Sequence, residues 1–416
     1  MNLERIQDKL DRGKKLRILF LNDVGFQYGA GIAQLRQIQS FLLLGHEVMG
    51  LCWRRGAEAD IPFFGQNGDG LWLGLRELTK IHYSEGYGKN ELIDALVNEV
   101  KRAAPDVVIV GNLHGAMWPL ETLLHLRDLN LLVVAYMHDC FLITGRCCYP
   151  GECRMYESGC DETCPTAREH PQLPPSQIRD AWKLRRAIFC GRDGIPLATN
   201  SNWTLNLAKR SFAELQCAGV VYLGLDEQLF KPIDRSLARR LLGIPEHQPV
   251  VLSGAVNLND KRKGWDIFKK VVSNLQEDLH FLIFGENSLK EKSVYGVGLL
   301  RDYRKMPILY SAADIFVATS LEEAFGQTVV EASSCALPVV AFNVGGFQEI
   351  ARHGTNAMLA GERNVESLLE AIRSLLNNPA KREALGKTGR EIVKKEFSLE
   401  KQGERWMEFI KKAVFN

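Results

Sequence analysis

The sequence places two glutamates, Glu323 and Glu331, eight residues apart around a short loop that is predicted to turn into a helix. The loop residues Ala324, Phe325 and Gly326 would bring backbone N–H groups to the start of that helix, where the helix dipole also favours phosphate oxygens. One carboxylate could then accept sugar hydroxyls while the other accepts a ribose diol. The pattern therefore predicts a site for a sugar nucleotide, although an isolated pair of glutamates is more often a solvated part of a helix surface.

The elements expected around this loop favour the binding site. The segment 313–320 has the pattern of a buried strand that ends at the loop, and 327–335 has the pattern of the helix that follows. The next strand is predicted over 338–342, and Gly345 and Gly346 then form a turn that opens another helix. The loop thus lies at the carboxyl end of a strand, which is where open α/β sheets bind ligands.

Basic residues before another predicted helix supply the complementary charge. Arg262 and Lys263 lie where they could meet a diphosphate, which gathers negative charge as a glycosyl bond breaks. An exposed basic turn is the ordinary alternative, and we expect it to hold for at least one residue of 261–263. Gly285 and Leu299 are predicted to lie at the pocket edge that receives the nucleobase.

The first half of the chain offers further candidates. Gly29 and Gly31 follow the first predicted strand and allow a ligand to approach the backbone, unless they only serve a tight turn. Their spacing is not that of a dinucleotide-binding loop, which argues against a dehydrogenase. His138 directly follows an apolar strand over 131–137, so its imidazole should emerge at the carboxyl edge of the sheet. His114 is a second candidate with weaker support.

Length and composition indicate an α/β protein of two domains. The chain has 416 residues and 46% hydrophobic residues, and strand-like runs alternate with helical patterns, as in parallel βαβ units. Lys and Arg number 52 against 50 Asp and Glu, so the net charge of +2 gives no signal for nucleic acid. The first residues are too charged for a signal peptide, and no apolar run approaches the roughly 20 residues of a membrane span. We therefore expect a cytoplasmic protein.

With these motifs in place, the sequence resembles the retaining glycosyltransferases of family 4 over nearly its whole length. In that family two glutamates are separated by seven residues, as Glu323 and Glu331 are here. The resemblance implies the GT-B fold, in which two Rossmann-like domains with parallel sheets face an inter-domain cleft. It also implies an acceptor-binding domain over 1–225, a nucleotide-sugar-binding domain over 226–398, and a last helix over 399–416 that crosses back to the first domain.

The same resemblance implies roles for the candidate residues. Glu323 would hold hydroxyls of the donor sugar, Glu331 would hold the ribose, and Lys263 would meet the leaving diphosphate. His138 would lie beside the reacting sugar, and the loop that contains Gly29 and Gly31 would face the donor phosphates and the acceptor.

One position departs from the family. Relatives commonly have an arginine where this chain has Ala255, so Arg262 or Lys261 would have to supply the second phosphate contact. The sequence has no convincing Asp-x-Asp motif, so we expect cations and helix termini, rather than a catalytic metal ion, to neutralise the leaving diphosphate. The family implies a front-face displacement in which the donor phosphate helps to deprotonate the acceptor hydroxyl.

A cysteine-rich insert over about 139–175 contains six of the ten cysteines. Such clustering in an intracellular chain favours a structural metal, with zinc the first choice, over disulfides. The spacing is not a standard pair of Cys-x-x-Cys motifs, so unligated thiols remain an alternative. The insert resembles one in family 4 enzymes that build bacterial surface polysaccharides. The residues predicted to form the four-thiolate zinc site are Cys147 or Cys148 with Cys153, Cys160 and Cys164.

A basic helical stretch follows Pro174 and Pro175. It could lie on an anionic membrane surface or bind a lipid diphosphate, but a solvated charged face is the more frequent explanation. Its cations are Arg179, Lys183, Arg185, Arg186 and Arg192.

The sequence therefore predicts a retaining, metal-independent hexosyltransferase. Its donor would be a nucleotide diphosphate sugar, with uridine or guanosine as the base. Its acceptor would be a hydroxyl of a glycan or a lipid-linked molecule in bacterial polysaccharide or glycolipid biosynthesis. The alternatives are a sugar-nucleotide epimerase or a phosphorylase on the same fold, and a non-catalytic scaffold that binds sugar nucleotides.

Overall fold

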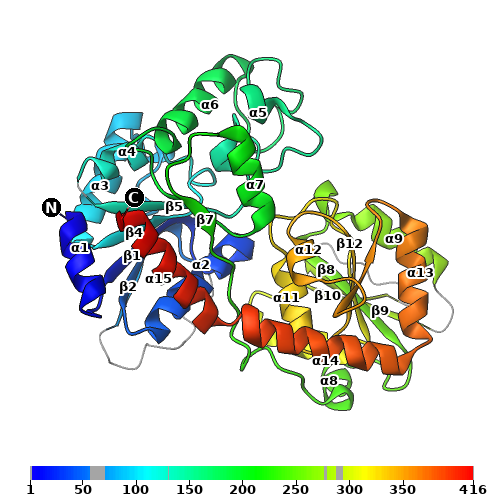
Figure 1. Ribbon diagram of the computed structural model, residues 1–416. Coiled ribbons are helices and arrows are strands. Elements are labelled where there is room, and N and C mark those ends of the chain that lie inside the picture. Colours follow the sequence, from blue (N-terminus) through cyan, green and yellow to red (C-terminus); the bar gives the residue numbers. More distant parts are fainter. Residues whose placement is uncertain (1, 57–70, 130, 276–278, 287–293, 416) are drawn as a thin grey trace. The chain divides into compact units, whose positions relative to one another are not determined.

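The computed structural model describes residues 2–56, 71–129, 131–275, 279–286 and 294–415. The chain divides into two compact units (Figure 1). Unit 1 contains residues 1–224 and 399–416, and unit 2 contains residues 225–398. Each unit is built on its own parallel sheet, in the order described below.

Unit 1 has a seven-stranded sheet with the order β3-β2-β1-β4-β5-β6-β7, and all its neighbouring strands are parallel. The central strands are almost continuous apolar runs, because helices that connect parallel strands cover both faces of the sheet. β4 reads Val-Val-Ile-Val and all four residues are buried. The strands are β1 Arg17–Val24, β2 Glu47–Arg54, β3 Trp72–Glu77, β4 Val107–Val110, β5 Leu132–Met137, β6 Leu197–Thr199 and β7 Ala218–Val220.

The helices of unit 1 include the last helix of the chain, α15, which packs against α2 (Figure 1). Trp406 of α15 is fully buried, and its ring lies 5.8 Å from that of Phe41 and 5.4 Å from that of Tyr136. The helices are α1 Asn2–Asp11, α2 Tyr28–Leu43, α3 Lys89–Ala103, α4 Thr122–Arg127, α5 Met155–Ser158, α6 Pro175–Phe189, α7 Asn202–Ser211 and α15 Leu399–Phe415, with short 3₁₀ turns η2 Tyr83–Glu85 and η3 Phe141–Ile143.

Unit 2 has a six-stranded parallel sheet with the order β10-β9-β8-β11-β12-β13. The adjacent apolar strands β11 and β12 are buried along their full length. The strands are β8 Val250–Asn257, β9 His280–Glu286, β10 Val294–Gly298, β11 Ile315–Ala318, β12 Val339–Phe342 and β13 Ala357–Ala360. The helices are α8 Arg235–Leu242, α9 Trp265–Asn274, α10 Met306–Ala312, α11 Gln327–Ser334, α12 Phe347–Ile350, α13 Val365–Leu376 and α14 Pro379–Glu396, with 3₁₀ turns η4 Lys261–Lys263 and η5 Tyr303–Lys305.

Two parallel α/β sheets confirm the predicted fold class, but some local predictions were wrong. Gly29 and Gly31 lie inside the first turn of α2 instead of in a loop before it, because the helix begins at Tyr28. The basic stretch also differs from the prediction. Arg192 lies beyond the end of α6, and Arg185 is buried, where it donates hydrogen bonds to the carbonyl oxygens of Phe141 and Ala181.

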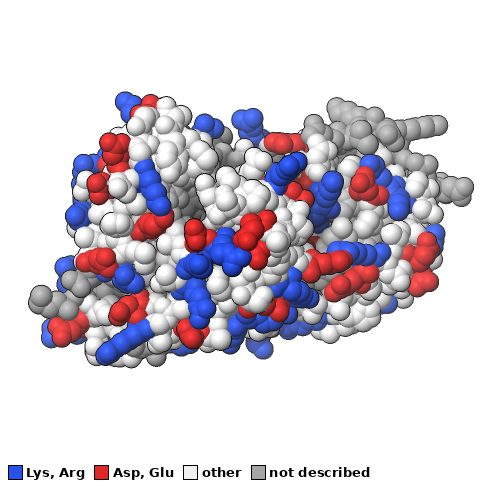
Figure 2. All heavy atoms as spheres, turned by 90° about the horizontal axis from the view of Figure 1, so that it is seen from above, with Lys and Arg blue, Asp and Glu red and all other residues white. Residues whose placement is uncertain are grey.

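The face of the molecule drawn in Figure 2 carries charged side chains of both signs. Figure 2 shows Lys and Arg side chains interspersed with Asp and Glu over that face. Among the described residues, no helix is both long enough and apolar enough to span a membrane.

Candidate functional site

The carboxyl edge of the unit 2 sheet gathers the loops that the sequence singled out. All six strands run in one direction, so the segments after β8, β11 and β12 leave the sheet at the same edge. The segment after β8 contains the turn η4 with Lys263, and the segment after β11 contains Glu323. The segment after β12 contains Gly345 and Gly346. Residues 60 positions apart in the chain thereby come into contact.

Glu323 is the centre of this contact. Lys263 donates from Nζ to Glu323 Oε2 at 2.6 Å, and Arg262 Nη1 lies 3.7 Å from the same oxygen. The Ser320 hydroxyl donates to that oxygen at 3.4 Å. The Glu323 side chain is 13% exposed and that of Lys263 is 25% exposed, so the ion pair is partly shielded from water without being closed off.

The ion pair shifts the pKa values of both partners downward. Burial alone would raise the pKa of Glu323, but the nearby Lys263 and Arg262 outweigh it, and the pKa of the carboxyl falls below its ordinary value. Burial lowers the pKa of Lys263, and the attraction of Glu323 opposes this only in part. Glu323 is therefore a carboxylate at neutral pH, and it can accept hydrogen bonds but not donate them.

Backbone contacts fix the Glu323 loop against its neighbours. The Gly346 N–H donates to the Glu323 carbonyl oxygen at 2.8 Å, and a Cβ atom on Gly346 would lie 2.4 Å from the carbonyl oxygen of Ala324. On the other side, the Leu321 N–H donates to the Arg262 carbonyl oxygen at 2.7 Å. Only glycine allows the turn after β12 to approach the loop this closely.

The remaining predicted donor-site residues lie in the same unit. Ala324 and Phe325 have buried side chains, and Gly326 adopts a left-handed conformation with φ of 106° just before α11. Glu331 on α11 is 7% exposed, and its Oε2 accepts a hydrogen bond of 2.8 Å from the Tyr310 hydroxyl. A buried carboxylate needs a hydrogen-bond partner, and the Tyr310 hydroxyl supplies one and fixes the orientation of the Glu331 side chain.

Gly285 is the second-last residue of β9, and Leu299 follows the adjacent strand β10. Gly285 has φ of 129°, and a Cβ atom there would lie 2.0 Å from the Ala255 carbonyl oxygen. The bend at the end of β9 therefore requires glycine and brings its backbone against the end of β8. Leu299 is half-buried just beyond the last residue of β10.

In unit 1, His138 lies directly after β5, as predicted from the apolar run before it. Burial, with a smaller effect from His114, lowers the pKa of His138 to about 3. The imidazole is therefore neutral at physiological pH. A Cβ atom on Gly111 would lie 3.0 Å from His138 Nε2, so glycine after β4 makes room for the ring.

Asn22 and Asp23, the polar residues near the end of β1, were not among the predicted site residues. Asn22 Oδ1 accepts from the Asn112 N–H at 2.7 Å, and Asp23 Oδ2 accepts from the Gly115 N–H at 2.7 Å. Both side chains thus position the loop that carries His114. The available signal was an amide and a carboxylate inside an otherwise apolar strand, since buried polar side chains need partners.

The cysteines of the predicted zinc site are free thiols. Burial raises the pKa of the Cys147 and Cys160 thiols. Of the residues that the structure describes, however, the group of three metal-binding side chains with all ligand atoms within 4.8 Å is a different one, formed by residues 114, 139 and 148. The four-thiolate zinc site stays a prediction.

Comparison with known proteins identifies part of the chain. Residues 234–392 match the family described as glycosyl transferases group 1. Most of unit 2 is therefore similar to group 1 glycosyltransferases. This segment contains Lys263, Glu323 and Glu331, whereas His138 and the cysteine-rich insert lie outside it.

One curated relative is the GDP-mannose-dependent monoacylated alpha-(1-6)-phosphatidylinositol monomannoside mannosyltransferase of Corynebacterium glutamicum. It is 30% identical over 228 residues, which cover 49% of this chain and 59% of the relative. The chain spans only 42% to 59% of the length of the first three curated relatives that it matches.

Two solved structures resemble nearly the whole chain. The sucrose-phosphate synthase of Thermosynechococcus elongatus has a TM-score of 0.71 at 18% identity and covers 96% of this chain and 99% of its own. The Anabaena protein HepE in complex with UDP-glucose has the same TM-score and identity, and covers 95% of this chain and 100% of its own. At this identity the likeness shows the fold alone, and with the two parallel sheets it gives the GT-B fold.

Proposed function

We propose that the protein is a retaining glycosyltransferase of family 4 that transfers a hexosyl unit from a nucleotide diphosphate sugar to a hydroxyl acceptor. The observation that carries the proposal is the Lys263–Glu323 ion pair at the carboxyl edge of a sheet inside the segment that is similar to group 1 glycosyltransferases. A cation beside an oriented carboxylate provides a partner for the diphosphate and a partner for sugar hydroxyls.

In this proposal Glu323 binds the donor sugar. Lys263, Arg262 and Ser320 all contact Oε2. We assign the other carboxylate oxygen, Oε1, to a hydroxyl of the sugar. Because its pKa lies below the ordinary value, Glu323 stays anionic and accepts from the hydroxyl throughout the neutral range.

Lys263 and Arg262 bind the leaving diphosphate. As the glycosyl bond breaks, negative charge gathers on the phosphate oxygens, and fixed cations stabilise that charge more than they stabilise the ground state. We assign the second phosphate contact to Arg262, because Ala255 offers no cation at the end of β8. With these cations in place, the proposed transfer needs no catalytic metal ion.

Glu331 takes the ribose and the loop Ala324–Gly326 takes the phosphates in the same proposal. Glu331 is already oriented by the Tyr310 hydroxyl, so ribose binding costs little rearrangement of the carboxylate. The nucleobase lies against the segments that contain Gly285 and Leu299. These segments would contact the base through backbone groups, so side-chain identity does not choose between uridine and guanosine.

His138 serves the acceptor side of the reaction. Its neutral imidazole can accept a hydrogen bond at one nitrogen and donate one at the other, which suits it to orient a sugar hydroxyl. The acceptor is proposed to be a glycan or lipid-linked molecule. The Corynebacterium relative is named for a phosphatidylinositol mannoside acceptor, which supports this class without choosing within it.

The proposal is tested by product analysis with Glu323→Gln as the matched variant. Incubation of the protein with nucleotide diphosphate sugars should release nucleoside diphosphate, by slow hydrolysis or by transfer, and Glu323→Gln should abolish the release. Conversion of the donor to another sugar nucleotide without release would indicate an epimerase. Consumption of free phosphate would indicate a phosphorylase, and binding without turnover would indicate a scaffold.

A further inference from the structure

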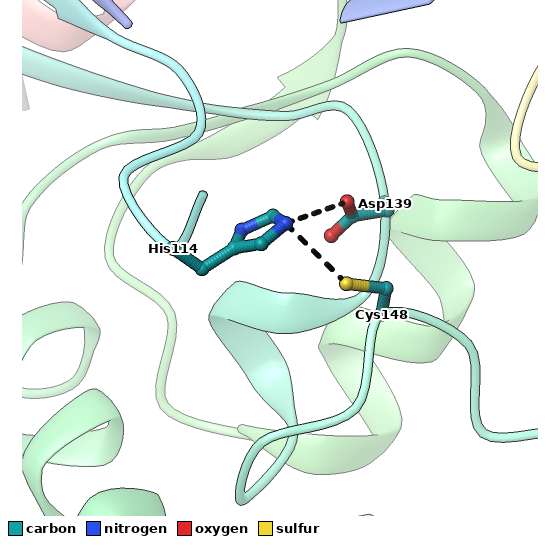
Figure 3. Close-up of side chains that lie close together, drawn as sticks. All are labelled: His114, Asp139 and Cys148. Carbon is teal, nitrogen blue, oxygen red and sulfur yellow. Dashed lines mark hydrogen bonds and ion pairs between the residues drawn. The ribbon is translucent and has the colours of Figure 1, made fainter. Parts of the chain in front are cut away.

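Three metal-binding side chains from separate segments converge at the carboxyl edge of the unit 1 sheet. Figure 3 shows His114, Asp139 and Cys148 pointing toward one another. His114 Nε2 lies 3.5 Å from Cys148 Sγ and 4.0 Å from Asp139 Oδ2. All three residues are partly shielded from solvent, and the exposed fractions of the His114 and Asp139 side chains are 11% and 12%.

We propose that these three residues bind a divalent transition-metal ion, with zinc as the natural choice for a nitrogen, sulfur and oxygen ligand set. Tetrahedral zinc with Zn–N of about 2.0 Å and Zn–S of about 2.3 Å separates the two ligand atoms by about 3.5 Å. The separation of His114 Nε2 and Cys148 Sγ matches this value. Asp139 Oδ2 would move inward by less than about 1 Å to complete the set.

Local contacts hold each ligand in place without the metal. The Phe141 N–H donates to Asp139 Oδ1 at 2.8 Å, and Oδ2, which accepts from Asn112 Nδ2 at 3.5 Å, lies 4.0 Å from His114 Nε2. The Cys140 N–H donates to the Cys148 carbonyl oxygen at 2.8 Å and keeps the cysteine beside the end of β5. The ring of His114 packs 4.6 Å from the ring of Phe141.

Three protein ligands leave the fourth coordination position of a tetrahedral zinc ion for water or for His170. The ring centroid of His170 lies 6.3 Å from that of His114, and it belongs to the exposed end of the insert. A metal at this point would join the loops after β4 and β5 to the insert, one residue beyond His138. Cys148, and not Cys147, belongs to this group of three, so the proposed site differs from a four-thiolate site that would use Cys147.

The adjacent cysteines provide a matched pair of variants. We would express the protein with zinc, remove loosely bound metal by dialysis, and count bound zinc by elemental analysis in the wild type, Cys148→Ala, His114→Gln and Cys147→Ala. The proposal predicts that Cys148→Ala and His114→Gln each lose one equivalent of zinc, while Cys147→Ala retains that equivalent. Circular dichroism would establish that each variant is folded.

Cobalt gives a second measurement that does not depend on activity. Co²⁺ substituted at the proposed site should show the charge-transfer absorption of one thiolate, lost in Cys148→Ala and kept in Cys147→Ala. Zinc retained in full by both Cys148→Ala and His114→Gln would overturn the proposal, as would a wild-type protein without bound zinc. Zinc lost in Cys147→Ala but kept in Cys148→Ala would also overturn it and would favour the four-thiolate site.

Discussion

At the scale of single residues, the pairing of Glu323 with Lys263 determines how the candidate donor site behaves. Replacing Lys263 with Ala leaves a shielded carboxylate without its nearest cation and removes a partner of the leaving diphosphate. We expect Lys263→Ala to reduce kcat by about 10²-fold or more, as losses of charge-stabilising groups do. Steady-state kinetics would measure this effect, and Lys269→Ala, at an exposed lysine on α9, is the control. Equal losses in both variants would contradict the assigned role.

The Lys263–Glu323 ion pair should also affect how donor binding depends on pH. The folded-state pKa of Glu323 is depressed, so the carboxylate contributes stability above its ordinary unfolded value and loses that contribution as pH falls through the folded value. Without Lys263 the pKa of Glu323 should rise. Donor binding by Lys263→Ala should therefore weaken at a higher pH than binding by the wild type. Identical pH profiles of donor binding for the two proteins would contradict the ion pair.

His138 should lose stability in the same direction, as the pH falls, but at a higher pH than Glu323. Its folded-state pKa of about 3 means that the unfolded chain takes up a proton near pH 6.5 that the folded chain does not. Stability should consequently decline as pH falls below about 6.5, and His138→Gln should flatten this decline. Histidine NMR resonances should show His138 unchanged between about pH 5 and 8. A resonance of His138 that shifts within this range would show that the imidazole is not neutral.

At the scale of elements, the glycine turn after β12 sets the position of the Glu323 loop. A Cβ atom at residue 346 would lie 2.4 Å from the Ala324 carbonyl oxygen, so Gly346→Ala forces the turn and the loop apart. We expect it to destabilise the protein by about 2 kcal/mol and to weaken donor binding. Gly361→Ala is the control, because its nearest contact would be at 3.7 Å. Chemical denaturation and a donor titration would measure the two effects.

The burial of the last helix, α15, leads to a prediction about the stability of unit 1. Trp406 of α15 is fully buried between aromatic rings of unit 1, so Trp406→Ala should lower the free energy of unfolding by about 3–5 kcal/mol. Phe415→Ala, at a residue 60% exposed near the end of the same helix, should have little effect. Urea denaturation would compare the two variants. A small effect of Trp406→Ala would mean that α15 contributes little to the stability of unit 1.

At the scale of the whole molecule, the sequence predicted those features that depend on local pattern. The apolar runs at β5, β11 and β12 were recognisable because strands buried on both faces must be continuously apolar. The edge strands β3, β10 and β13 were missed, since all three are partly exposed, β3 and β10 contain glycine, and β13 has only 4 residues.

Contacts between residues far apart in the sequence could not be predicted from the local sequence pattern. The spacing of Glu323 and Glu331 suggested two ligand partners, but not that Lys263 would pair with one and Tyr310 would orient the other. In the same way, Cys148 was considered only with other cysteines, because nothing in the sequence shows that His114, 34 residues earlier, lies 3.5 Å from it. Tertiary structure determines such pairs.

Donor binding is the most direct test of the proposed function. Isothermal titration of the intact protein with UDP- and GDP-sugars should show selective binding for one base, which Lys263→Ala and Glu331→Ala weaken and the control Lys269→Ala does not. This result would support a nucleotide-sugar site at the carboxyl edge of the unit 2 sheet. Absence of binding with every donor, or binding that neither variant changes, would contradict the proposal.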